Sequence, residues 1–84
     1  MKYTVYILRR AQKSLARLPK QDFARGRDAI RALGDEPRPP GARKLTDRPG
    51  WRIRVGAYRI LYDIDDAVLT VTVLDIGHRG DVYR

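Results

Sequence analysis

The chain has no cysteine, a single histidine (His78), one tryptophan, one phenylalanine and no long apolar run. Without cysteine there is neither a disulfide nor a thiolate metal site, and one imidazole is too few for a metal centre built on histidines. No window approaches the roughly 18 apolar residues of a membrane-spanning helix, and the apolar run of residues 1–8 is too short for a signal peptide. We therefore expect a cytoplasmic protein that has no metal, no cofactor and no contact with a membrane.

Acidic residues are also in the minority. The chain has 18 basic and 10 acidic residues, a formal net charge of +8, and all but four of the basic residues are arginine. Arginine carries a planar fork of donors that suits phosphate, and it does not give up its proton. The composition favours a nucleic acid or an acidic protein as partner, although a solvated basic surface would have the same composition.

The length of 84 residues allows one small core, so we expect a single domain over residues 1–84. Apolar residues alternate over 2–8 and predict a strand. Helical spacing follows, first in a helix that ends before Pro19, and then in a second helix with Asp22 as its N-cap and Gly34 just past its end. These two helices are expected to form a hairpin.

The sequence pattern of the second half of the chain predicts β-strands. After a proline-rich loop at 35–41, strand patterns appear at 42–45, at 51–64 and at 68–76. This order predicts an α+β fold: an N-terminal strand and a helical hairpin packed on a three- to four-stranded, mainly antiparallel sheet.

The segment 51–62 is predicted to be a β-hairpin with an arginine face. Apolar and charged residues alternate up to Val55, and Gly56-Ala57 suits a two-residue type II′ turn. That turn pairs Arg54 with Arg59 and Arg52 with Leu61. Like charges placed directly opposite each other destabilise a ladder by a few tenths to roughly 1 kcal/mol. We therefore interpret this face as a site for the phosphates of a polyanion.

The hairpin is accompanied by other motifs in a fixed order. They are Ala11-x-Lys13-x-Leu15-x-x-Leu18-Pro19, Lys44-Leu45 and Ile76-Gly77-His78-Arg79-x-Asp81-Val82-Tyr83. Together with the hairpin they cover nearly the whole chain, and this pattern resembles the RelE/ParE superfamily of bacterial and archaeal toxins, with RelE closer than ParE.

The resemblance implies the toxin of a type II toxin–antitoxin system. Such a toxin enters the ribosomal A site, cleaves mRNA there and is held silent by a cognate antitoxin in a hetero-oligomeric complex. The functional residues of the family fall on Arg52, Arg54, Arg59, Arg79 and Tyr83. Some relatives carry lysine where this chain has Arg52 and Arg54, and others use a glutamate and a histidine for proton transfer.

Metal-free RNA cleavage needs the 2′-hydroxyl deprotonated, the phosphorane charge stabilised and the 5′-oxygen protonated. Guanidinium groups serve the second task, since one preorganised donor contributes roughly 3 to 4 kcal/mol. Proton transfer falls to Tyr83 or to His78, whose ordinary pKa is about 6.5. Each residue also has a structural interpretation: His78 as a turn residue, and Tyr83 as an apolar side chain that closes the end of the core. Tyr83 is in addition a candidate for stacking on a base.

Other readings stay open at this point. Arg43 and Lys44 are candidate RNA-binding residues, and a solvated role fits them equally well. The arginines of the hairpin also suit the acidic segment of an antitoxin. A ParE-like inhibitor of DNA gyrase would use the same scaffold, and a non-catalytic member would bind RNA without cutting it.

Overall fold

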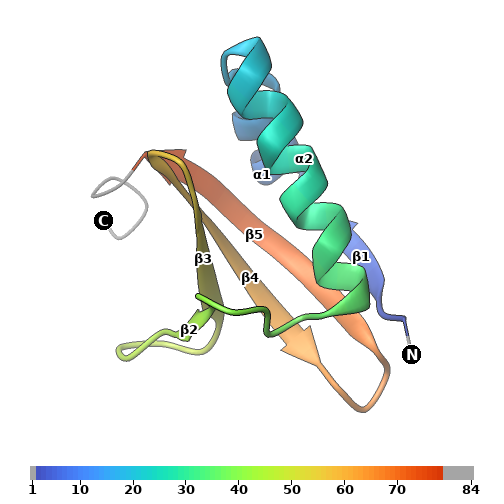
Figure 1. The fold of residues 1–84 in the computed structure, drawn as a ribbon. Coiled ribbons are helices and arrows are strands. Elements are labelled where there is room, and N and C mark those ends of the chain that lie inside the picture. The colour runs from blue at the N-terminus through green and yellow to red at the C-terminus, as the bar shows by residue number, and fades with distance from the viewer. Residues whose placement is uncertain (1, 79–84) are drawn as a thin grey trace.

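The computed structural model describes residues 2–78. These residues form a strand, two helices and then four further strands (Figure 1). Their bounds are β1 Thr4–Ile7, α1 Arg9–Ala16, α2 Lys20–Asp35, β2 Arg43–Lys44, β3 Trp51–Val55, β4 Tyr58–Asp65 and β5 Thr70–His78. This order is the predicted one.

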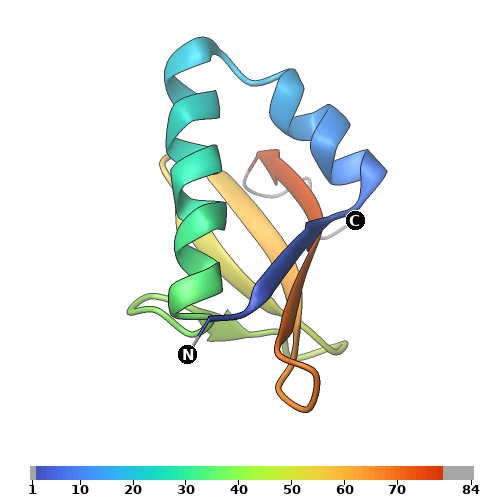
Figure 2. The same ribbon diagram turned by 90° about the vertical axis from the view of Figure 1, so that its right-hand side faces the viewer.

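The five strands form one sheet in the order β1-β5-β4-β3-β2. The strands β2 to β5 pair antiparallel with their neighbours, and β1 joins the sheet at its edge, parallel to β5. Both helices pack on one face of this sheet (Figure 2). The predicted α+β fold, with an N-terminal strand and a helical hairpin on a mainly antiparallel sheet, is confirmed.

The arginine hairpin has the predicted register. Arg54 lies opposite Arg59 and Arg52 opposite Leu61. Gly56 begins the turn with a φ of +62°, which a type II′ turn needs at its first position and which glycine adopts without steric cost. The register of the hairpin could be predicted from the sequence because it depends only on residues that are close together in the chain.

The predicted ends of the second helix were wrong. The helix α2 begins one turn earlier than expected, with Pro19 at the N-cap. Asp22 lies within the first turn, where its negative charge interacts favourably with the positive end of the helix dipole. Gly34 lies inside the helix. A Cβ there would be 3.2 Å from the carbonyl oxygen of Tyr3, so this glycine permits close approach of α2 to the N-terminal segment.

The last strand also begins later than predicted. Residues 66–69 form a turn, in which Leu69 has a φ of +53° and the carboxylate of Asp65 accepts hydrogen bonds from the amides of Ala67 and Val68. In this turn the amides of Ala67 and Val68 thus bond to a side chain, whereas in a strand they would bond to the backbone carbonyls of a neighbouring strand.

The main core lies between the helices and the sheet. Its fully buried side chains include Leu33, Ile60, Tyr62, Val71 and Val73. A second, smaller cluster lies apart from this core, where Leu45 and Leu61 are buried with Leu74 packed against them. The loop that follows β2 is thereby attached to the sheet by Leu45.

Candidate functional site

The arginines of the hairpin face away from the helices. Ile53 and Ile60 are buried in the main core, and side chains alternate along a strand. Arg52, Arg54 and Arg59 therefore project from the opposite face of the sheet. Cationic side chains from two adjacent strands are gathered there.

A pocket of about 740 Å³ opens beside this face. Its lining residues come from the hairpin and from the segment that includes β2, and they are Ala42, Arg43, Lys44, Leu45, Thr46, Asp47, Trp51, Arg52 and Arg59. Arg43 lies directly opposite Arg52, and Lys44 lies opposite Trp51. The pocket brings four of the predicted site residues together: Arg43, Lys44, Arg52 and Arg59.

Arg54 belongs to a second, smaller pocket of about 330 Å³. This pocket is lined by Pro40, Gly41, Arg43, Arg52, Ile53 and Arg54. Because Arg43 and Arg52 line both pockets, the two hollows are neighbours on one basic surface. We refer to the five basic residues that line these two pockets as the basic face: Arg43, Lys44, Arg52, Arg54 and Arg59.

Arg59 lies inside the sheet, with a neighbouring strand on each side. It lies in β4, flanked by Arg54 on β3 and by Gly77 on β5, and its Nε atom is buried. A glycine partner presents no side chain beside it. A guanidinium held in this way is preorganised toward a ligand, and such fixed charges stabilise developing negative charge most strongly where water is excluded.

The remaining predicted residues are placed differently. His78 is the cross-strand partner of Tyr58, and their rings meet edge to face at a centroid distance of 5.6 Å. Ile76 is buried in the core, so alternation along β5 puts His78 on the helix side of the sheet, away from Arg59. Arg79 and Tyr83 lie outside the described residues.

Five lining residues of the larger pocket were not among the predicted site residues, and Trp51 and Asp47 are the two of these that have an aromatic or charged side chain. Trp51 is half-buried against the core, and it also lines the larger pocket. Asp47 contributes an exposed carboxylate to the same pocket. No local pattern marks either residue, because the pocket exists only when the loop after β2 folds beside the hairpin.

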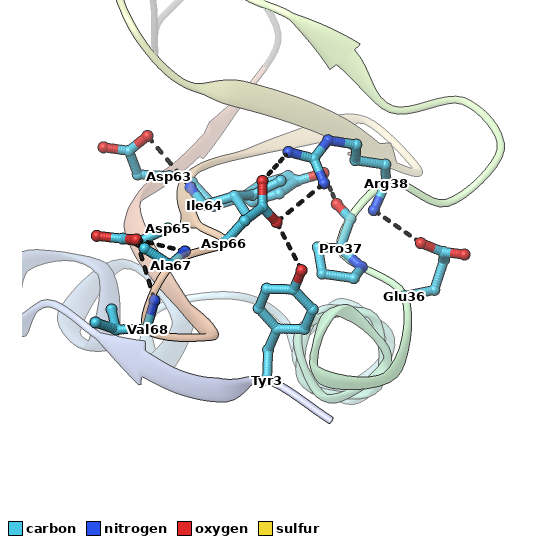
Figure 3. A network of polar contacts seen from close by, with 11 residues as sticks. Tyr3, Glu36, Pro37, Arg38, Asp63, Ile64, Asp65, Asp66, Ala67 and Val68 are labelled. Carbon is cyan, nitrogen blue, oxygen red and sulfur yellow. Dashed lines mark hydrogen bonds and ion pairs between the residues drawn. The ribbon is translucent and has the colours of Figure 1, made fainter. Parts of the chain in front are cut away.

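Tyr3, Arg38 and Asp66 form a polar clamp, in which three distant segments of the chain meet (Figure 3). Arg38 donates to both carboxylate oxygens of Asp66, at 3.4 and 2.9 Å, and the Tyr3 hydroxyl donates to Oδ1 at 2.6 Å. The Arg38 guanidinium also lies 5.2 Å from the centre of the Trp51 ring. The hydrogen bonds from Arg38 and Tyr3 lower the pKa of Asp66, and the bond to Asp66 raises the pKa of Tyr3.

Within the described part of the chain, no group of three or more histidine, cysteine, aspartate or glutamate side chains is placed to hold a metal ion. No helix among these residues is long and apolar enough to cross a membrane.

Comparison with known proteins shows which family has this fold and sequence. The family model described as the ParE toxin of the type II toxin–antitoxin system, parDE, matches residues 5–83. The chain belongs to the RelE/ParE superfamily of toxins. It is 37% identical to Toxin RelG of Mycobacterium tuberculosis over 86 residues, which span 100% of this chain and 99% of RelG.

Solved structures of RelE/ParE toxins show the same architecture. A chain of the RelBE2 toxin–antitoxin complex of M. tuberculosis matches with a TM-score of 0.81 and 33% identity, over 94% of this chain and 100% of that one. The archaeal RelE–RelB complex of Pyrococcus horikoshii matches with a TM-score of 0.85 and 29% identity, over 96% and 99%. The predicted family is confirmed, and these relatives carry RelE names as the resemblance had indicated.

Proposed function

We propose that this toxin is a ribosome-dependent endonuclease that cleaves mRNA in the A site without a metal ion. The observation that carries the proposal is the larger pocket, in which Arg43, Lys44, Arg52 and Arg59 converge. Four cations around one hollow suit the closely spaced phosphates of a nucleic acid, and three of the four are arginines able to bind phosphate in a bidentate manner.

The proposed reaction is an attack of the RNA on its own backbone. The 2′-oxygen forms a bond to phosphorus as its proton is removed, the bond from phosphorus to the 5′-oxygen breaks, and that oxygen takes up a proton. The products are a 2′,3′-cyclic phosphate and a 5′-hydroxyl. Arg52, Arg54, Arg59 and Arg79 stabilise the additional negative charge of the phosphorane.

Proton transfer is assigned to Tyr83 first. Arginine is an unsuitable base because its pKa lies above about 12, and His78 lies on the helix side of the sheet. His78 remains the second candidate. The pH dependence of the cleavage rate in Tyr83→Phe and His78→Gln separates the two, because loss of the proton carrier removes one limb of the profile.

The proposal includes a cognate antitoxin as partner, in a hetero-oligomeric complex, and the cytoplasm as the place of action, where ribosomes and mRNA are found. The related toxins from M. tuberculosis and P. horikoshii were crystallised as toxin–antitoxin complexes, which supports this part. The single domain of residues 1–84 is proposed to carry the whole activity.

The test is induction of the toxin in bacteria without an antitoxin, with mapping of mRNA 5′ ends by primer extension. We expect cuts inside translated codons that disappear when initiation is blocked. The name of the matching family model makes a ParE-like gyrase inhibitor the second candidate. Growth arrest with intact mRNA, together with inhibition of gyrase supercoiling by the purified toxin, would favour that candidate and contradict the proposal.

A further inference from the structure

The strand β2 is held weakly by its own pairing. It has two residues, Arg43 and Lys44, and pairs with β3 over two positions at the edge of the sheet. One of those positions places Arg43 opposite Arg52, and like charges in that arrangement repel. The position of Arg43 and Lys44 at the larger pocket therefore depends on contacts made by residues outside β2.

The contacts directly after β2 are one apolar contact and one backbone hydrogen bond, both made by Leu45. The side chain of Leu45 is buried against Leu61, and its amide donates to the carbonyl oxygen of Gly50 at 2.9 Å. These contacts fix the C-terminal side of β2. They leave the approach to β2 from the proline-rich loop to be fixed separately.

The contacts before β2 are polar and come from distant parts of the chain. The hydroxyl of Tyr62 donates to the carbonyl oxygen of Pro37 at 2.7 Å, and Arg38 bridges Asp66 and the Trp51 ring. The amide of Ala42 then donates to the carbonyl oxygen of Pro39 at 2.9 Å, directly before β2. In Figure 3 the carboxylate of Asp66 lies between Arg38 and Tyr3, so one side chain joins the loop to the β4–β5 turn and to the N-terminal segment.

We propose that Asp66, acting through Arg38, is a positioning residue that holds β2 against β3 in opposition to the repulsion between Arg43 and Arg52. Its consequence for RNA, tighter binding at Arg43 and Lys44, rests on the proposed function. The positioning itself does not, because it is a property of the free toxin.

The first experiment measures amide hydrogen exchange by NMR in the free, full-length toxin. In Asp66→Asn we expect the amides of Ala42 and Leu45 to exchange roughly two- to fivefold faster, the range set by the strength of an exposed ion pair. The matched control is Asp63→Asn, which removes an exposed carboxylate of β4 that accepts a hydrogen bond from the adjacent Ile64 amide. Exchange at Ala42 and Leu45 that is unchanged in Asp66→Asn, or equally faster in the control, would overturn the proposal.

The second experiment separates positioning from a general loss of stability. In ribosome-dependent cleavage we expect Asp66→Asn to raise the KM for programmed ribosomes roughly two- to fivefold without changing kcat. The same change should have no further effect in a variant that already carries Arg43→Gln and Lys44→Gln, because the residues being positioned are gone. An equal rise in KM in that background would show that Asp66 acts by another route.

The two experiments fail in different ways. A wild-type toxin that does not cleave mRNA on ribosomes contradicts the proposed function, while faster exchange at Ala42 in Asp66→Asn still supports the positioning. Cleavage by the wild type with unchanged exchange and unchanged KM in the variant contradicts the positioning and leaves the proposed function intact.

Discussion

Arg54 and Arg59 lie directly opposite each other in the β3–β4 ladder. One residue pair further from the turn, Ile53 opposes Ile60, and both are buried in the main core. The hairpin is thus held by its apolar face while its other face brings like charges together. A second arginine pair, Arg43 with Arg52, repeats the arrangement between β2 and β3. The like charges of the basic face therefore destabilise the sheet that carries them.

Arg43→Gln should stabilise the fold and weaken RNA binding. Removal of the charge relieves the repulsion of Arg52, so we expect the free energy of unfolding to rise by about 0.2–1 kcal/mol in urea titrations at low salt. The gain should shrink as salt is added, since the charges are screened. Arg31→Gln, on the exposed side of α2, removes the same charge and serves as the control. An equal gain in this control would assign the effect to net charge rather than to the pair.

Gly34→Val should destabilise the packing of α2 on the N-terminal segment. The new side chain would meet the Tyr3 carbonyl oxygen and Val5 Cγ2, each already 3.2 Å from the position of a Cβ. We expect a loss of about 1–3 kcal/mol, as is usual for overpacking. Ala32→Val changes an exposed position of the same helix and should lose only about 0.5 kcal/mol through helix propensity. Equal losses in the two variants would contradict the close approach.

Tyr62→Phe should remove the buried hydrogen bond to the carbonyl oxygen of Pro37. An unsatisfied buried carbonyl is expected to lower the free energy of unfolding by about 1–3 kcal/mol near neutral pH. Thermal melts of the two proteins, each with circular dichroism to confirm the fold, give the comparison. A melting temperature equal to that of the wild type would show that the bond contributes nothing.

The same tyrosine predicts how stability depends on alkaline pH. Burial raises the pKa of Tyr62 to about 12, above the value of about 10 in an unfolded chain. Its contribution is therefore fully present below pH 10 and is lost as the pH rises from about 10 to 12, by about 3 kcal/mol over that range. In urea titrations from pH 8 upward, the wild type should lose more stability than Tyr62→Phe. Parallel curves for the two proteins would contradict the raised pKa.

Features that depend on neighbouring residues could be predicted from the sequence. The hairpin register could be inferred from the alternation up to Val55 and from the Gly56-Ala57 turn. The end of α1 could be inferred from Pro19, which does not continue a helix. The position of Gly34 was misjudged because the same residue type serves either as a helix terminator or as a point of close contact. Which of these applies depends on Tyr3, which lies far away in sequence.

The assembly of the basic face could be predicted only in part. The alternation of the hairpin placed Arg52 and Arg54 on one side, but nothing local indicated that Arg43 would lie opposite Arg52. The clamp was missed altogether, since Tyr3 and Asp66 are 63 positions apart and neither stands in a recognisable motif. Contacts of this kind are set by the packing of the whole chain rather than by periodicity.

The most direct test of the central claim is single-turnover cleavage of mRNA on purified ribosomes by the wild type and by Arg59→Ala, with Arg31→Ala as the matched control. If Arg59 stabilises the phosphorane from the basic face, its loss should lower the cleavage rate about 10²–10³-fold while the control cleaves at nearly the wild-type rate. A rate for Arg59→Ala within twofold of the control, or an equal loss in both variants, would contradict the account.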